Sequence, residues 1–149
     1  MGSILAIKND GGSGAIDQMV LAEYCQHHFH SHVRELRQAL RRKLDVLIEC
    51  LRSQFGAEAE FEDPPGGIFL WVRLPESVET TRLTQLALQS GVSVNPGAEW
   101  MTDAGAGRKR IRLCFAHPSE ETIREGVARL AEVCHREFAV PVRKEKEHR

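Results

Sequence analysis

The chain has 149 residues, of which 42% are hydrophobic and 28% are charged. That length suits one domain with its own core, and that balance is typical of a soluble globular protein, not of a disordered one. A formal net charge of −1 gives no reason to expect a polyanionic partner such as nucleic acid. No apolar stretch is long enough for a transmembrane helix, and the first residues lack the pattern of a secretory signal.

The chain begins with a glycine-rich segment and a long helical pattern. Residues 9–14, Asn-Asp-Gly-Gly-Ser-Gly, predict a flexible linker, since they match no complete phosphate-binding motif. From Ile16 the pattern is helical, and a break or bend is expected between Gln26 and Ser31. Apolar residues then step by three or four along one helix face, ending before the stop at Gly56: Val33, Leu36, Leu40, Leu44, Leu47, Leu51 and Phe55.

A strand, a helix and a second strand are predicted in the middle of the chain. Residues 64–67, Pro-Pro-Gly-Gly, are typical of a tight turn. Residues 68–74 alternate as a strand, with Phe69 and Trp71 on the face opposite Leu70 and Val72. A short helix is expected over residues 79–90, and a short strand over residues 92–95, which the pair at 96–97 turns.

The last part of the chain predicts a loop, a strand and a helix. Residues 98–109 are expected to form an exposed loop, and residues 110–115 a strand of period two. Ser119 is a candidate N-cap for a helix that reaches Phe138, before Pro141. The fold class is therefore α+β, with a small, mostly antiparallel or mixed sheet of about three strands. Helices cover the sheet, and a long helical segment precedes it.

The arginine in the last predicted strand is the candidate of most interest. Arg112 points away from the core face, together with Arg110 and Cys114. A guanidinium can bind a carboxylate through two parallel hydrogen bonds, although an arginine there is also typical of a solvated or ion-paired surface. The spacing does not choose between Arg110 and Arg112.

Cysteines and histidines offer weaker signals. The cysteines, at positions 25, 50, 114 and 134, match neither a zinc site nor a disulfide framework, which favours reduced thiols in a cytoplasmic protein. His28 and His32 are four residues apart and share a helix face that can seat a metal. No third ligand completes the set, so a polar helix surface is the simpler interpretation. His117 fits a helix entry.

Several motifs in order carry a resemblance to a known family. They are Pro65-Gly66-Gly67-Ile68-Phe69-Leu70-Trp71-Val72-Arg73-Leu74-Pro75, Gly91-Val92 with Asn95-Pro96-Gly97, Ile111-Arg112-Leu113-Cys114-Phe115-Ala116, Glu125-Gly126-Val127 with Leu130, and His32 with Leu36-Arg37. Together they resemble the C-terminal small domain of class I/II aminotransferases, the fold-type-I enzymes that use pyridoxal 5′-phosphate. The group with 2-aminoadipate transaminases and MocR-type regulators is the most similar.

The resemblance implies a function for the complete protein and a role for two residues. It implies an enzyme of amino acid metabolism that moves an amino group between an amino acid and a 2-oxo acid, as a homodimer. Arg112 would bind the substrate α-carboxylate, and Phe69 would border the substrate pocket. Residues 1–15 would join a preceding large domain, residues 16–140 would form the small domain, and residues 141–149 a charged tail.

The cofactor-binding parts of the family are missing from this sequence. The surroundings of Lys8 lack the family's Schiff-base lysine motif, so Lys8 is not assigned as catalytic. The chain alone is therefore expected to bind no pyridoxal 5′-phosphate and to be inactive. Two alternatives stay open, namely an effector-sensing domain of a MocR-type transcription regulator, or a stand-alone small-molecule-binding domain.

Overall fold

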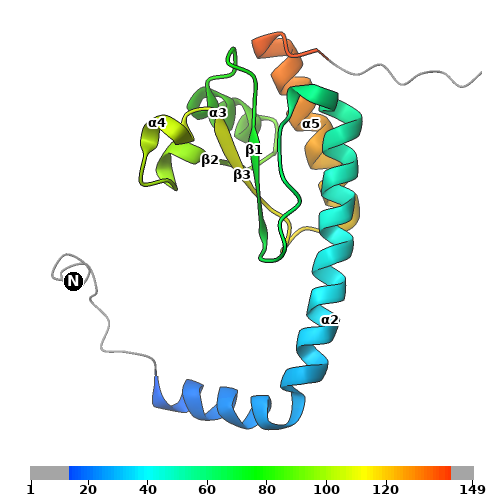
Figure 1. Ribbon diagram of the computed structural model, residues 1–149, viewed down its shortest axis with the longest axis vertical. Helices are drawn as coiled ribbons and strands as arrows, with labels where there is room; N and C mark the ends of the chain where they lie inside the picture. Colours follow the sequence, from blue (N-terminus) through cyan, green and yellow to red (C-terminus); the bar gives the residue numbers. More distant parts are fainter. Residues whose placement is uncertain (1–13, 142–149) are drawn as a thin grey trace, which may run out of the picture. The chain divides into compact units, whose positions relative to one another are not determined.

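The computed structural model describes residues 14–141, and the chain divides into two compact units, residues 1–38 and 39–149. The linker of residues 9–13, Lys8 and the tail beyond Pro141 lie outside the described residues. The elements are α2 (Ala15–Phe55), η1 (Gly56–Glu58), β1 (Phe69–Arg73), α3 (Thr80–Gln89), β2 (Asn95–Pro96), η2 (Gly97–Glu99), α4 (Ala104–Gly107), β3 (Arg110–Cys114) and α5 (Glu120–Phe138) (Figure 1). This order confirms the α+β prediction.

The described part of the first unit is helical and largely exposed. Helix α2 continues without a break, and the expected change of direction is seen as a bend of its ribbon (Figure 1). Within the expected interval, the Ser31 hydroxyl donates to the His28 carbonyl at 3.0 Å, a type of hydrogen bond that often bends helices. No helix within residues 14–141 has both the length and the apolarity to cross a lipid bilayer.

The predicted apolar stripe of α2 is buried only in its C-terminal part. Leu44, Leu47, Leu51 and Phe55 are buried, whereas Leu36 is 46% exposed. Within the stripe, the residues from Leu40 onward belong to the core or pack against it. Periodicity shows which face of a helix is apolar, but burial also needs a surface to pack against, and within the second unit that surface is the sheet and α5.

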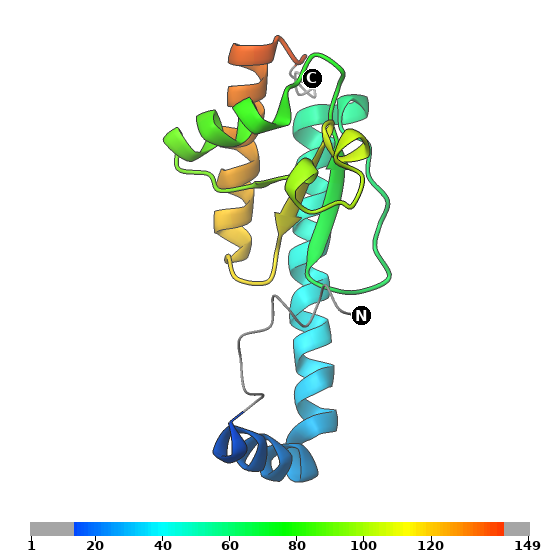
Figure 2. The ribbon, with the colours of Figure 1, turned by 90° about the vertical axis from the view of Figure 1, so that its left-hand side faces the viewer.

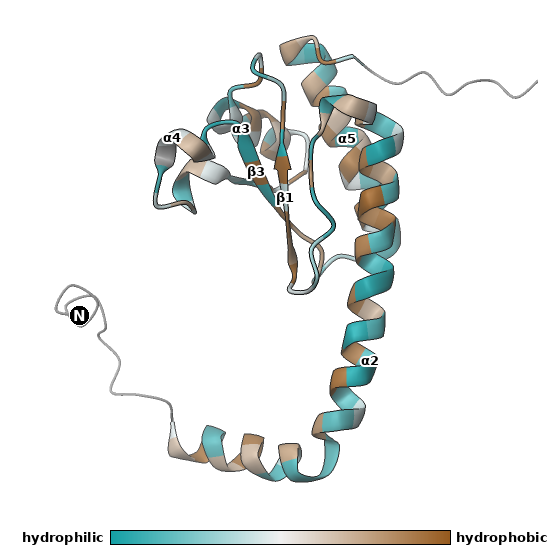
Figure 3. Cartoon of the chain, viewed as in Figure 1, coloured by the Kyte–Doolittle hydropathy of each residue, from teal (hydrophilic) through white to brown (hydrophobic). Residues whose placement is uncertain are grey.

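The sheet of the second unit is antiparallel, in the order β1-β3-β2. Leu70 pairs with Leu113 and Val72 with Ile111, and these four side chains are buried on the inner face. The C-terminal part of α2 and helices α3 and α5 contribute to the same core, as the second view illustrates (Figure 2). Apolar residues are frequent on β1 and on the C-terminal part of α2 (Figure 3). The outer face of the sheet carries side chains that are only half-buried or exposed, among them Phe69, Trp71 and Arg112.

Helices α3 and α5 begin at side-chain caps. The Ser119 hydroxyl accepts a hydrogen bond from the Thr122 N–H, which confirms the predicted cap of α5. At α3 the carboxylate of Glu79 accepts from the Thr81 and Arg82 N–H groups. Desolvation by burial opposes the charge of this carboxylate, but the hydrogen bonds from Arg82 and Thr81 prevail and lower the pKa of Glu79.

Two predicted boundaries differ from the structure. Strand β2 covers Asn95–Pro96 instead of residues 92–95, and Pro96 pairs with Ile111. Proline has no N–H to donate to a neighbouring strand, and it is tolerated here because β2 is an edge strand of the sheet. The expected loop 98–109 contains the helical turn α4, whose first N–H groups bond to the Asp103 carboxylate. The short polar cap at Asp103 explains this turn.

Candidate functional site

The outer face of the sheet gathers polar and aromatic side chains around its central strand. Arg112 lies in the middle of β3, opposite Trp71 of β1 and Asn95 of β2. The alternation of β3 places Arg110 and Cys114 on the same face, and both are exposed, whereas Arg112 is half-buried. This difference between neighbours on one face is the first sign that Arg112 has a particular environment.

Two aromatic rings pack on the guanidinium of Arg112. Its Cζ is 4.0 Å from the ring centroid of Phe69 and 3.4 Å from that of Trp100. These distances are well inside the range of a cation–π interaction. Its Nε is buried and, within residues 14–141, has no hydrogen-bond partner. Arg112 is thus a half-buried cation whose buried Nε donor is unused within the described residues.

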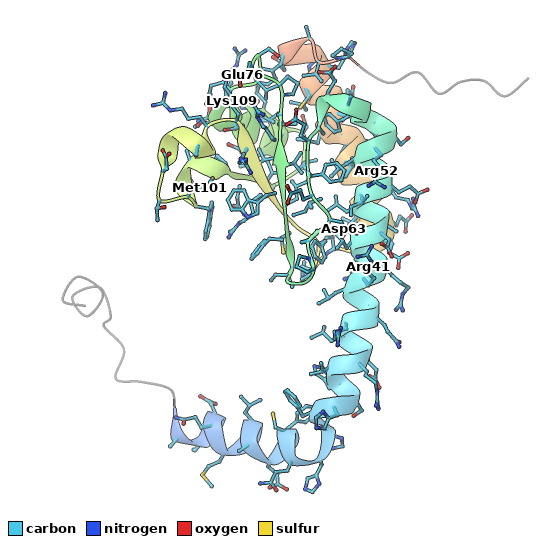
Figure 4. The ribbon with its side chains drawn as sticks, viewed as in Figure 1. Arg41, Arg52, Asp63, Glu76, Met101 and Lys109 are labelled. Carbon is cyan, nitrogen blue, oxygen red and sulfur yellow. The ribbon has the colours of Figure 1, made fainter. Side chains whose placement is uncertain are left out.

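Phe69 also borders a cavity of about 590 Å³ on this side of β1. The segment 60–65 forms one wall, and Arg110 and Met101 contribute to the lining; Figure 4 labels Met101. The two residues predicted for substrate binding are therefore neighbours, since Phe69 packs on Arg112 and lines the cavity. The structure brings them together, whereas their separation along the sequence is more than forty residues.

Ion pairs hold the wall of this cavity. Arg41 of α2 donates to both carboxylate oxygens of Asp63, at 3.1 and 2.9 Å, and the two residues lie side by side in Figure 4. Arg73 of β1 pairs with Glu60 at 3.2 Å, and the two residues form a backbone bridge. Because these anchors tie residues 60–63 to α2 and to β1, the cavity has a fixed wall next to the sheet.

Arg110 and Arg112 differ in their surroundings. Arg110 is exposed and lines the cavity. Arg112 instead has the rings of Phe69 and Trp100 packed on its guanidinium. Aromatic surroundings lower the local dielectric constant, and a charge-assisted hydrogen bond is then stronger than in water. Of the two arginines that spacing left open, Arg112 therefore has the environment that favours a tightly bound anion.

The sequence did not identify Trp100 as part of the site. It was placed in an expected exposed loop, and its side chain is indeed 52% exposed. The missed signal is the large aromatic residue three positions after Gly97, at the end of the turn that follows the edge strand. The turn η2 carries it over Arg112.

The described lysines do not fit the role of a Schiff-base amine for pyridoxal 5′-phosphate. The Lys43 Nζ donates to the Ala116 carbonyl at 2.7 Å, and the Lys109 Nζ donates to the Glu76 carbonyl at 2.6 Å. Lys109 also pairs with the Glu76 carboxylate at 3.6 Å, and the two residues are neighbours in Figure 4. Both amines are therefore held by the fold. Residues 14–141 offer no amine for the cofactor.

Histidines and cysteines form no metal site within residues 14–141. Rings of Tyr24 and His28 have centroids 5.0 Å apart, and those of Tyr24 and His32 are 5.8 Å apart, which places the three on one helix face. No group of three or more possible metal ligands occurs in the described part of the chain. All four cysteines are free in the structure. His28 and His32 lie on an exposed helix face and contact the Tyr24 ring.

Comparison with known proteins shows the family of the chain. Residues 12–130 match the family model described as Aminotransferase class I and II. The 2-aminoadipate transaminase of Thermus thermophilus is 30% identical over 77% of the chain and 29% of its own length. An uncharacterized HTH-type transcriptional regulator of Bacillus subtilis is 29% identical over 86% of the chain and 26% of its own length.

A solved structure is similar in fold to the chain. The alpha-aminoadipate aminotransferase LysN of Thermus thermophilus, in complex with N-(5′-phosphopyridoxyl)-L-leucine, gives a TM-score of 0.75 at 28% identity. The match covers 83% of the chain and 32% of that protein. The chain thus spans about a quarter to a third of the length of these relatives.

Proposed function

The chain belongs to the class I and II aminotransferase family, and we propose that it is the C-terminal small domain of a pyridoxal-phosphate-dependent aminotransferase. The complete protein moves an amino group between an amino acid and a 2-oxo acid. The part of this chain is to bind the α-carboxylate of either substrate through Arg112, with Phe69 beside the bound molecule. Pyridoxal 5′-phosphate, when bound to the complete protein, supplies the carbon–nitrogen chemistry.

One observation carries the proposal. The guanidinium of Arg112 is packed between aromatic rings next to a cavity of about 590 Å³, and its Nε has no partner within residues 14–141. A buried donor without a partner, on a partly desolvated cation, costs free energy unless a ligand compensates it. A carboxylate compensates both the charge and the unused donors of an arginine. The substrate is therefore the natural counterion of Arg112.

The cofactor is held by polypeptide other than residues 14–141. Lys43 and Lys109 are both engaged in hydrogen bonds to backbone carbonyls, and the chain spans less than a third of the length of its aminotransferase relative. Large exposed apolar residues on α2 support a covering segment supplied from elsewhere: Ile16, Met19, Val20, Leu21, Tyr24, Phe29 and Leu36. A cytoplasmic homodimer completes the proposal, and light scattering on the complete protein tests its dimeric state.

The test of carboxylate binding is the substitution Arg112→Leu in the complete protein, with Arg110→Leu as the matched control. Loss of a charge-assisted pair should weaken capture of both amino and oxo acids by at least about tenfold to a hundredfold. Arg110→Leu removes a charge from the same strand face and should change capture far less, because Arg110 is exposed. Half-reaction kinetics with each substrate provide the measurement. Equal half-reaction rates in Arg112→Leu and the unaltered protein would remove the assignment.

The second test concerns the 149-residue chain alone. Mixed with pyridoxal 5′-phosphate, it should develop no visible absorption band that borohydride removes, because Lys43 and Lys109 are engaged. A stoichiometric band of that kind, traced by mass spectrometry to one lysine, contradicts the proposal that the amine comes from elsewhere.

A second candidate function has its own support. The similar regulator of Bacillus subtilis matches 86% of the chain. In this version the same carboxylate site senses an amino compound, and a separate domain binds DNA, since the net charge of −1 gives no reason to expect nucleic-acid binding by this chain. The coding sequence upstream of Met1 distinguishes the two. A winged helix-turn-helix there favours the regulator, a large aminotransferase domain alone favours the enzyme, and neither would favour a stand-alone binding domain.

A further inference from the structure

Trp100 and Phe69 cover opposite faces of the Arg112 guanidinium. A ring centroid 3.4 Å from Cζ leaves no room for a second ring on the same face. Phe69, at 4.0 Å, therefore lies against the other face. The chain order agrees, since Phe69 comes from β1 on one side of β3, and Trp100 follows β2 on the other side. The guanidinium sits in an aromatic slot.

The turn that carries Trp100 is anchored to the sheet. Pro96 pairs with Ile111, directly before the turn begins at Gly97. The Trp100 N–H donates to the Gly97 carbonyl at 3.0 Å. Gly97 itself packs so closely on backbone that an added Cβ would lie 2.7 Å from the Arg110 carbonyl oxygen. The backbone therefore fixes the start of the indole side chain relative to the strand of Arg112.

The slot limits how an anion reaches the arginine. The two faces are covered, and Nε is buried. The Nη groups at the free edge are then the donors left for a ligand. A flat carboxylate meets that edge in the plane of the guanidinium with two hydrogen bonds. A tetrahedral anion directs oxygens out of that plane, toward the two rings.

We propose that Trp100 is a positioning residue that holds the Arg112 guanidinium edge-on and makes the site selective for planar carboxylates. This inference rests on the proposed carboxylate-binding function of Arg112. It also explains why a tryptophan that is 52% exposed lies on this turn, because its contact is with Arg112 and not with the core. The indole acts on the substrate through the arginine.

The experiment uses the 149-residue chain and the nitrogen-15 signal of the Arg112 side chain. In the unaltered chain the Nε–H should exchange slowly with water and be shifted by the ring currents of both aromatics. Pyruvate serves as the planar probe and methylphosphonate as the tetrahedral one. Trp100→Leu should speed exchange of this N–H, weaken pyruvate binding about threefold to thirtyfold, and reduce the preference for pyruvate. Trp100→Phe, which keeps a ring, should restore most of each effect.

The matched control is Trp71→Leu, the same change on the same sheet face. Trp71 is the cross-strand partner of Arg112. Within residues 14–141, however, the rings that stack on the Arg112 guanidinium are those of Phe69 and Trp100. Trp71 also lines the cavity, so this variant is a control for the exchange measurement alone, and Trp71→Leu should leave the protection of the Arg112 Nε–H in place. The methyl signals of the buried Leu51 and Leu83 report whether each variant keeps its fold.

The outcomes separate this inference from the function on which it rests. Unchanged Nε–H exchange and unchanged pyruvate affinity in a folded Trp100→Leu chain overturn the role of Trp100. If Arg112→Leu abolishes pyruvate binding in that same series, carboxylate binding stands without the positioning role. If Arg112→Leu binds pyruvate like the unaltered chain, or the unaltered chain does not bind it, the carboxylate function fails. The exchange measurement then still decides whether the slot exists.

Discussion

Gly97 lies so close to neighbouring backbone that replacing it with alanine should destabilise the fold. A Cβ at this position would lie 2.6 Å from the Gly107 carbonyl oxygen and 2.7 Å from that of Arg110. Both neighbours are main-chain atoms and cannot rotate away as a side chain does. Ordinary contact starts near 3.4 Å, so η2 must shift by roughly 0.8 Å, and overpacking of this kind costs about 1–3 kcal/mol.

Urea denaturation measures this cost, and the matched control is Gly66→Ala. At Gly66 no atom lies within 4 Å of an added Cβ, so its stability should stay within about 0.5 kcal/mol of the unaltered chain. The shift of η2 in Gly97→Ala should also move Trp100 from Arg112 and speed exchange of the Arg112 Nε–H. A Gly97→Ala chain as stable as the Gly66→Ala chain would refute the argument that the close approach of Gly97 sets the turn.

Two further predictions concern titratable groups. Glu79→Gln keeps an acceptor at the α3 cap but removes the charge. Because the pKa of Glu79 is lowered in the folded chain, the stability that its charge adds is present above the ordinary value of 4.5 and disappears as the pH falls through the folded pKa. Stability curves of the two chains should therefore converge in acid, and a constant gap would contradict this. Burial raises the pKa of Cys134 to about 12, so its thiol should resist iodoacetamide while the exposed Cys114 reacts. The same raised pKa should lower the stability of the fold as the pH rises from the ordinary value of 9.0 toward 12. Equal labelling of both cysteines in the folded chain would count against the burial of Cys134.

Local chemistry explains which parts of the fold were predictable. The alternation of buried and exposed side chains in β1 and β3, and the Ser119 cap, each depend on a few adjacent residues. The structure confirms both. The position of β2 was not predictable in this way, because pairing with β3 decides it, and Pro96 was interpreted as a turn residue. The exposure of Leu36 likewise depends on what packs against the helix and not on its period.

The same distinction applies to the site. That Arg112 leaves the core face follows from a period of two, and its preference over Arg110 came from a family resemblance. Its neighbours Phe69 and Trp100 come from two other segments, which only folding brings together. Trp100 in particular has no periodic pattern around it, since it follows a turn whose position is set by the close approach of Gly97 to the next strand.

The two faces of the sheet differ in composition. Inner residues such as Val72 and Ile111 are fully buried against the helices, so the apolar core of the second unit lies on that face. Arg112 follows Ile111 in the central strand β3, so its backbone is held by both neighbouring strands and gives the side chain a rigid base. A rigid base, an aromatic slot and a free edge are what a bidentate anion site requires, because each reduces the freedom lost on binding. Because Arg112 and Trp100 lie outside the apolar core, substitutions of these two residues are expected to change binding more than they change folding.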